Sequence, residues 1–131
     1  MPLPRFLRSL TLATLTLVTL PAAAGEILAY TPAAFDALNN AGKAVVVDVY
    51  APWCPTCQAQ KPIIQHLAAQ PAFHDVTVLT VDFDHDKTAL HRFGVFTQST
   101  LIAFHTRHEV NRSAGDTTPD GIRGLFEQVA K

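Results

Sequence analysis

The chain has few cysteines, little charge and no internal repeat. Its 131 residues include two cysteines, 16% charged residues and a formal net charge of −1. Two cysteines are too few for a four-ligand zinc site, and no second Cys-x-x-Cys or His-x-x-x-His pair is present to complete one. The absence of a basic excess argues against binding to nucleic acid. Apolar residues make up 48% of the chain, enough for one domain whose core needs no disulfide staples.

The two cysteines, Cys54 and Cys57, enclose Pro55 and Thr56 and directly follow the apolar run 44–51. This order predicts a Cys-x-x-Cys between a strand and a helix. There the first sulfur lies near unpaired N–H groups and the positive end of the helix, which favour a thiolate. The second sulfur, one turn further in, can close a disulfide with it. Because a disulfide across so short a loop stabilises a fold little, the motif predicts a redox pair and not a structural bridge.

The N-terminal residues have the three parts of a secretory signal. Two arginines within the first eight residues precede the apolar run 10–20, and small residues follow up to Ala24. We predict a signal peptide at 1–24 and a mature domain at 25–131. The apolar run is short for a membrane span, and an uncleaved anchor facing the periplasm is the alternative. Export would place the cysteines in an oxidising compartment, periplasmic or extracellular, where a reductant has to be recharged by a partner.

Periodicity and capping residues predict the order β-α-β-α-β-α-β-β-α. The expected strands lie at 26–30, 44–50, 76–83, 100–105 and 107–112, and the expected helices at 32–40, 55–70, 87–93 and about 119–129. The early alternation predicts parallel crossovers, and the late hairpin adds antiparallel strands to the same sheet, so the fold class is α/β. Pro62 predicts either a kink in the second helix or two separate helices.

Three acidic residues, Asp82, Asp84 and Asp86, surround the start of the third expected helix. Carboxylates are favoured at helix N-termini, whereas they could also serve as oxygen ligands for a cation. We interpret them as helix-start carboxylates and expect no metal site there.

Several segments together resemble the thioredoxin family. Residues 47–57, which read VDVYAPWCPTC, resemble the strand-to-helix segment of that family, with its buried aspartate six positions before the first cysteine. Pro62 matches a helix-kinking proline, residues 93–104 resemble the segment around the cis-proline loop, and Gly115 matches a glycine before the last helix. The resemblance runs from Glu26 to the C-terminus and implies a thioredoxin-like three-layer α/β/α sandwich with a central mixed sheet.

The resemblance implies roles for four residues. Cys54 would be the exposed nucleophile that forms a mixed disulfide with the substrate, and Cys57 would be the buried thiol that resolves it. Asp48 would be a buried carboxylate with a raised pKa that relays a proton to or from Cys57, and a hydrogen-bonded structural aspartate is the alternative. Trp53 would cover the disulfide, unless it is an ordinary core aromatic.

One position departs from the family pattern, because Ser99 stands where the family has its cis-proline. A cis bond before a residue other than proline costs about 3 kcal/mol, so we expect a trans bond there. We expect the N–H and hydroxyl of Ser99 beside the Cys54 thiolate, where either would lower its pKa or bind a substrate backbone. Gln98, Pro55 and Thr56 would complete the active-site loop. The missing proline also leaves open a metal or iron–sulfur cluster shared by two chains.

The expected function is that of a thiol–disulfide oxidoreductase, more specifically a monomeric, exported protein-disulfide reductase without a cofactor. Its partners would be protein disulfide substrates and a membrane-embedded thiol that donates electrons. A disulfide donor or isomerase is the alternative within redox enzymes. A non-catalytic chaperone or metal-binding module with the same fold is the alternative of another class.

Overall fold

The structure, a computed structural model of the chain, describes Met1 and residues 24–130. Nearly all of the signal peptide expected at residues 1–24 lies outside the described residues, so its presence and cleavage stay predictions. Among the residues that are described, no helix is long and apolar enough to cross a membrane.

The helices and strands follow one another in the expected order. The strands are β1 (Glu26–Ala29), β2 (Ala44–Tyr50), β3 (Val76–Asp82), β4 (Thr100–His105) and β5 (His108–Ala114), and the helices are α1 (Pro32–Asn40), α2 (Pro55–Ala68), α3 (Lys87–Phe93) and α4 (Pro119–Glu127), with the short 3₁₀ helix η1 (Pro71–Phe73) after α2. The strands form a five-stranded sheet in the order β1-β3-β2-β4-β5. β1, β3 and β2 run parallel, whereas β4 is antiparallel to both of its neighbours, so the expected mixed sheet is confirmed.

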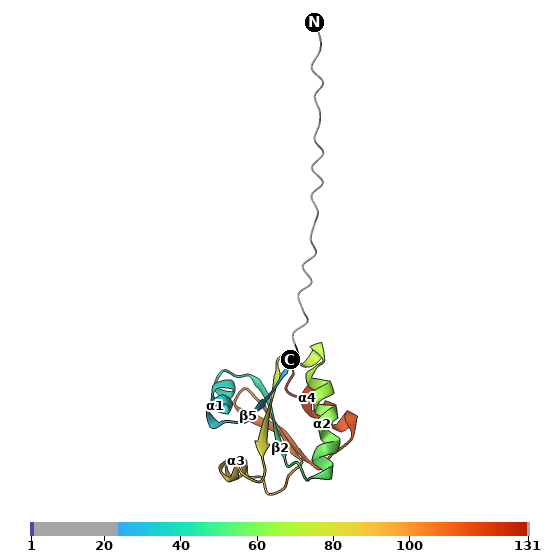
Figure 1. Cartoon of the computed structure of the whole chain (residues 1–131). Coiled ribbons are helices and arrows are strands. Elements are labelled where there is room, and N and C mark those ends of the chain that lie inside the picture. Colours follow the sequence, from blue (N-terminus) through green and yellow to red (C-terminus); the bar gives the residue numbers. More distant parts are fainter. Residues whose placement is uncertain (2–23, 131) are drawn as a thin grey trace.

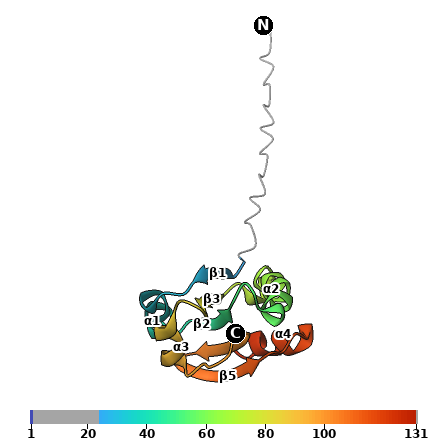
Figure 2. The ribbon, with the colours of Figure 1, turned by 60° about the horizontal axis from the view of Figure 1, so that its bottom comes forward.

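The helices cover both faces of this sheet, which gives three layers. α1 and α3 lie on one face, and α2 and α4 lie on the other (Figures 1 and 2). On the first face, Phe35 packs edge-on against Phe93 and Phe104, with ring centroids 5.0 and 5.1 Å apart. On the second face, Phe73 and Phe126 make a similar contact at 5.5 Å. Each face therefore has its own aromatic-centred core, as an α/β/α sandwich requires.

Strand β2 lies in the middle of the sheet and contributes to both cores. Val45, Val47 and Val49 belong to the cluster under α1 and α3, whereas Ala44 and Val46 belong to the cluster under α2 and α4. Because side chains alternate between the two faces of a strand, the residue after Val47 points toward α2 and α4. The continuous apolar run predicted a strand covered on both sides, and this prediction is confirmed.

The structure corrects several element boundaries. α2 continues through Pro62, so the alternative of two separate helices is wrong. The third strand ends at Asp82 and not one residue later, because the Asp82 carboxylate accepts the backbone N–H groups of Asp84 and His85 and turns the chain. Arg107 belongs to the hairpin turn and not to β5, since its φ of +72° is left-handed and unsuited to a strand.

Candidate active site

The two cysteines lie at the junction between the end of β2 and the start of α2. Cys54 is the N-cap of the helix, with extended backbone angles of −85° and 114°, and its Sγ accepts the backbone N–H of Cys57 at 3.1 Å. Pro55 follows at the first helical position, where its missing N–H costs no helical hydrogen bond. The helix start therefore presents an N–H donor to the first sulfur, and such a donor stabilises negative charge there.

Both cysteines are free thiols, and both residues are only 1% exposed. The expectation that Cys54 is exposed is therefore wrong. Its side chain packs in a small cluster with Ala51 and Cys57, and the partly buried rings of Tyr50 and Phe83 lie against this cluster. The Cys54 side chain is therefore enclosed by the packing at this end of β2, although it lies at a helix N-terminus.

The second thiol is held in its protonated form. Burial, and secondarily the hydrogen bond with Cys54, raise the pKa of the Cys57 thiol to about 11. Its Sγ also lies 3.9 Å from the carbonyl oxygen of Val49, to which it donates. A thiol with this pKa is a poor nucleophile at neutral pH, so any attack by Cys57 requires a nearby group that takes its proton.

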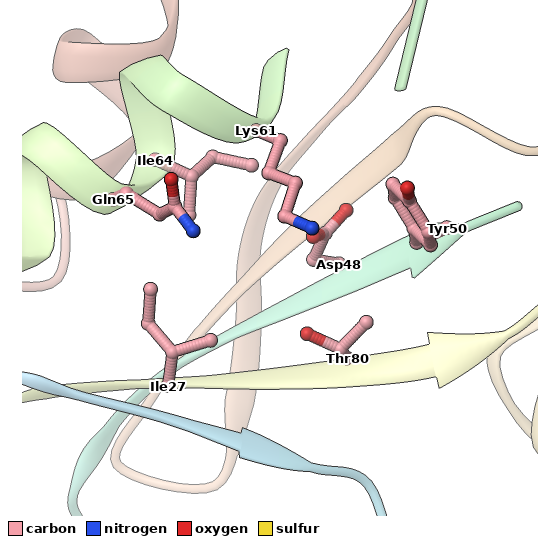
Figure 3. A pocket seen from close by; sticks show the side chains of 7 residues that line it. All are labelled: Ile27, Asp48, Tyr50, Lys61, Ile64, Gln65 and Thr80. Atoms are coloured by element: carbon pink, nitrogen blue, oxygen red, sulfur yellow. The ribbon is translucent and has the colours of Figure 1, made fainter. Parts of the chain in front are cut away.

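A carboxylate suited to that task lies beneath α2. Asp48 points from β2 toward this helix and is 8% exposed, and burial raises the pKa of its carboxyl group to about 6, partly offset by the charge of Lys61. Lys61 reaches from α2 toward Asp48 (Figure 3), and both side chains line a cavity of about 160 Å³. Its other lining residues are Ile27, Tyr50, Ile64, Gln65 and Thr80. The space is large enough for water molecules that could carry a proton to or from Asp48.

Trp53 stands at the surface next to the cysteines. The residue is 56% exposed, so the alternative of an ordinary core aromatic is wrong. Its indole Nε1 donates to Asp84 Oδ2 at 2.8 Å, and its ring meets Phe83 edge-on at 6.4 Å. Asp84 therefore anchors the aromatic ring on the rim of the site. Two of the three acidic residues near α3 therefore have a structural role: Asp84 binds the indole of Trp53, and Asp86 is the N-cap of α3.

Ser99 adopts a left-handed conformation, with φ of +58°, and the described residues contain no cis peptide bond. The expected trans bond before Ser99 is confirmed. Its N–H donates to the carbonyl of Val49 at 2.8 Å and its hydroxyl to the carbonyl of Gln98 at 2.6 Å. Both groups are thus engaged within the protein, and the expectation that they are available to the Cys54 sulfur is wrong. The Ser99 backbone also has a small lowering effect on the pKa of Cys57, which burial raises far more strongly.

The remaining predicted loop residues flank the cysteines. Pro55 is exposed, whereas Thr56 and Gln98 are half-buried. Phe96, three residues before Ser99, is 89% exposed and is an apolar group that a partner could cover.

A comparison with known families decides what this arrangement is. The family model described as Thioredoxin matches residues 26–128. The chain belongs to the thioredoxin family. Its Cys-Pro-Thr-Cys therefore has the spacing of a thioredoxin active site, and its sandwich is a thioredoxin-like fold.

Individual thioredoxins support this assignment. A thioredoxin of Chlamydia muridarum is 37% identical over 84 residues, which cover 64% of this chain and 80% of the relative. Among solved structures, Trxlp from Edwardsiella tarda is 42% identical, with a TM-score of 0.73 over 80% of this chain and 99% of that one. A mutant thioredoxin from Halobacterium salinarum is 25% identical, with a TM-score of 0.71 over 82% and 92% of the two chains. The protein is thus a thioredoxin-family thiol–disulfide oxidoreductase.

Two thioredoxin-site residues were missed by the sequence reasoning. Lys61 faces the cavity above Asp48, but an isolated lysine on a helix usually indicates a solvated surface. Gln60 is fully buried on the side of α2 that also carries Cys57. A detectable signal existed for Gln60, since it follows Cys57 by three positions and precedes Ile64 by four, which places a polar residue on the apolar face of the helix.

Within residues 24–130, no three His, Cys, Asp or Glu side chains are grouped so that they could hold a metal ion. The shared cluster between two chains concerns an assembly and stays untested.

Proposed function

We propose that this thioredoxin is an exported reductase of protein disulfides, with Cys54 as the nucleophile and Cys57 as the resolving thiol. The observation that carries this proposal is the asymmetry of the two sulfurs. The Cys54 sulfur accepts an N–H at the helix start, whereas burial keeps Cys57 protonated with a pKa of about 11. A carboxylate with a pKa of about 6 lies under the same helix.

The reaction proceeds in two exchanges. The Cys54 thiolate attacks one sulfur of the substrate disulfide, a bond forms between these two sulfurs, and the other substrate sulfur leaves as a thiolate and takes up a proton. Cys57 then gives up its proton, which the Asp48 carboxylate takes up, and attacks Cys54. The mixed disulfide breaks, the second substrate sulfur leaves and is protonated, and a Cys54–Cys57 disulfide remains. Two electrons have moved to the substrate.

The oxidised protein then has to be reduced again. The signal predicted at residues 1–24 supports a location outside the cytoplasm, where soluble thiol reductants are scarce. We therefore include in the proposal a membrane-embedded dithiol that reduces Cys54–Cys57 and becomes oxidised itself. Fractionation of cells that make the whole chain tests the location. A protein that begins at residue 25 and is released with the periplasm supports export. A full-length protein that stays with the membranes supports the anchored alternative.

The cysteine roles are tested with the mature chain and insulin as the protein disulfide, with dithiothreitol as the recycling reductant. We expect Cys54→Ser to abolish the catalysed reduction. Cys57→Ser, incubated with insulin without dithiothreitol, should accumulate a covalent complex that later addition of dithiothreitol releases. Each variant is the matched control of the other, since both replace one sulfur by oxygen. Catalysis that survives in Cys54→Ser, or trapping by Cys54→Ser instead of Cys57→Ser, would contradict the assignment.

The direction of electron flow is tested by the reduction potential of the couple, measured against thiol–disulfide buffers. A value near that of thioredoxin, about −270 mV, supports a reductant, whereas a value near about −120 mV, as in strong periplasmic oxidants, would make the protein a disulfide donor. A normal potential without turnover on any disulfide would favour the non-catalytic chaperone.

A further inference from the structure

Gln60 is a polar residue at a position that helical packing reserves for apolar side chains. It is 0% exposed and lies on the inner side of α2, one turn after Cys57. Its Nε2 donates to the carbonyl of Ser99 at 3.2 Å and to the carbonyl of Asp116 at 2.8 Å. A single side-chain amide thus connects the cysteine helix to two loops that are distant from it in the sequence.

One of these loops contains the strained residue of the site. A left-handed conformation is unfavourable for a residue with a Cβ atom, so the surrounding contacts have to hold Ser99 at its φ of +58°. Its N–H is bound to the Val49 carbonyl, and its own carbonyl accepts both Gln60 Nε2 and the N–H of Gly115. The peptide groups on both sides of the residue are therefore fixed.

We propose that Gln60 is a positioning residue, whose amide holds the loop 95–99 in the one conformation that presents a protein substrate to the cysteine pair. This inference rests on the proposed reductase function, because the presented substrate is a polypeptide. Gln60 acts through Ser99 and touches neither the substrate nor the sulfur atoms.

The chemistry of the side chain supports this role. The amide nitrogen carries two N–H groups, which suffice for two carbonyl acceptors, and an apolar residue of similar size has none. The amide also has a cost, because Gln60 Oε1 is buried and has no hydrogen-bond partner among the described residues. A buried side chain that leaves its acceptor unsatisfied is poorly explained by stability alone, whereas the fixed position of the Ser99 loop accounts for it.

The loop also bears the groups that a substrate would meet. Phe96 is 89% exposed and Thr97 is exposed, whereas Ser99 is buried, as is Thr100 at the start of β4. The buried half of the loop is thus anchored and the exposed half faces outward. If Gln60 no longer held Ser99, the exposed half would sample several positions, and binding of a polypeptide would have to select one of them.

The test replaces Gln60 by methionine, which keeps the volume and removes both donors. We expect KM for insulin to rise about tenfold, the effect of losing the buried hydrogen bond to Ser99, with kcat changed less than about twofold. Reduction of 2-hydroxyethyl disulfide should stay within about twofold, because so small a substrate needs no loop contact. Hydrogen exchange at the Ser99 N–H should accelerate by about tenfold, since the loop opens more often.

The matched control is Gln70→Met. Gln70 lies beyond the far end of α2, and its Oε1 accepts from Arg123 Nη2 of α4 at 2.9 Å. The control also removes a side-chain hydrogen bond from the α2 and α4 side of the sheet, but away from the cysteines. We expect it to leave the KM for insulin, the reduction of 2-hydroxyethyl disulfide and the exchange of the Ser99 N–H unchanged. Should Gln60→Met fold poorly, Gln60→Asn keeps the amide but is too short to reach both carbonyls, and the same results are expected.

A second background tests whether Gln60 acts through Ser99. Glycine adopts the left-handed conformation without strain, so in Ser99→Gly the loop needs less support. We expect the KM effect of Gln60→Met to shrink to less than about threefold in that background. An undiminished effect would overturn the link to Ser99.

The other outcomes also decide the question. A KM for insulin that stays within about twofold while stability falls would make Gln60 purely structural, and equal slowing of the small disulfide would place its effect on the sulfurs and not on the loop. If the wild-type protein reduced no protein disulfide, the reductase function would fail, but hydrogen exchange at Ser99 would still show whether Gln60 holds the loop.

Discussion

Replacement of Asp48 by asparagine should make the protein more stable at neutral pH. Burial raises the pKa of this carboxyl group from 3.8 to about 6, so the folded state resists its ionisation. Each pKa unit corresponds to about 1.36 kcal/mol, and the ionised carboxylate therefore costs the folded state about 3 kcal/mol at pH 7. Asparagine has nearly the same shape and cannot ionise, so Asp48→Asn avoids this cost.

The pH dependence follows from the direction of the shift. In the folded protein Asp48 retains its proton to higher pH than in the unfolded chain, so between pH 3.8 and about 6 the folded state binds more protons. The stability of the wild-type protein relative to the variant is thus greatest below about pH 4 and declines as the pH rises to about 6. The two proteins should be similarly stable near pH 4, and the variant should exceed the wild type by about 3 kcal/mol above pH 7.

The assay is urea unfolding of the reduced proteins, followed by circular dichroism at several pH values between 4 and 8. Other titrating groups are the same in both proteins, so they cancel in the difference. Asp120→Asn, at an exposed position in the first turn of α4, provides the control and should change stability by less than about 0.5 kcal/mol. Parallel curves for wild type and Asp48→Asn over the whole range would refute the reasoning, because they would show that burial does not disfavour the charge.

Two further predictions concern the groups around this carboxylate and the loop. Lys61→Met should raise the pKa of Asp48 further, because the charge that opposes the effect of burial is removed, and carbon-detected NMR titration measures the change. The control Lys43→Met, at an exposed position before β2, should leave the titration unchanged, and a fall in the Asp48 pKa on loss of Lys61 would contradict the prediction. Ser99→Pro should lower the free energy of unfolding by at least about 2 kcal/mol, since proline requires a φ near −65° and cannot donate to Val49. Ser99→Gly should raise the free energy of unfolding by about 1 kcal/mol, because glycine adopts the left-handed conformation without strain. Urea unfolding measures both, and a proline variant as stable as wild type would show that the left-handed conformation is dispensable.

The elements of the fold and the redox pair were predictable because their signals are local. The apolar run of β2 and the cysteines that follow it specify a buried strand that ends in a helix, and the structure contains both. The carboxylate of Asp48 stood out for the same reason, as the one charge in an apolar strand. Its burial and raised pKa agree with the prediction.

The features that could not be predicted depend on contacts between distant segments. Lys61 meets Asp48 only because α2 crosses over β2, and Gln60 meets Ser99 across 39 positions of sequence. The burial of Cys54 was missed because it depends on how side chains pack around it in three dimensions. Local patterns describe the element that carries a residue, but they do not specify which surface closes over it.

The burial of Cys54 has a consequence for the working life of each molecule. Oxidation of a thiolate beyond the disulfide level gives sulfinic and sulfonic acids, which a thiol donor cannot reverse, and susceptibility follows exposure of the sulfur. With the residue only 1% exposed, peroxide has little access to this atom between catalytic cycles. The burial of Cys54 thus acts as chemical protection. It favours polypeptide partners, whose binding can expose the sulfur, over small oxidants that meet the protein by chance.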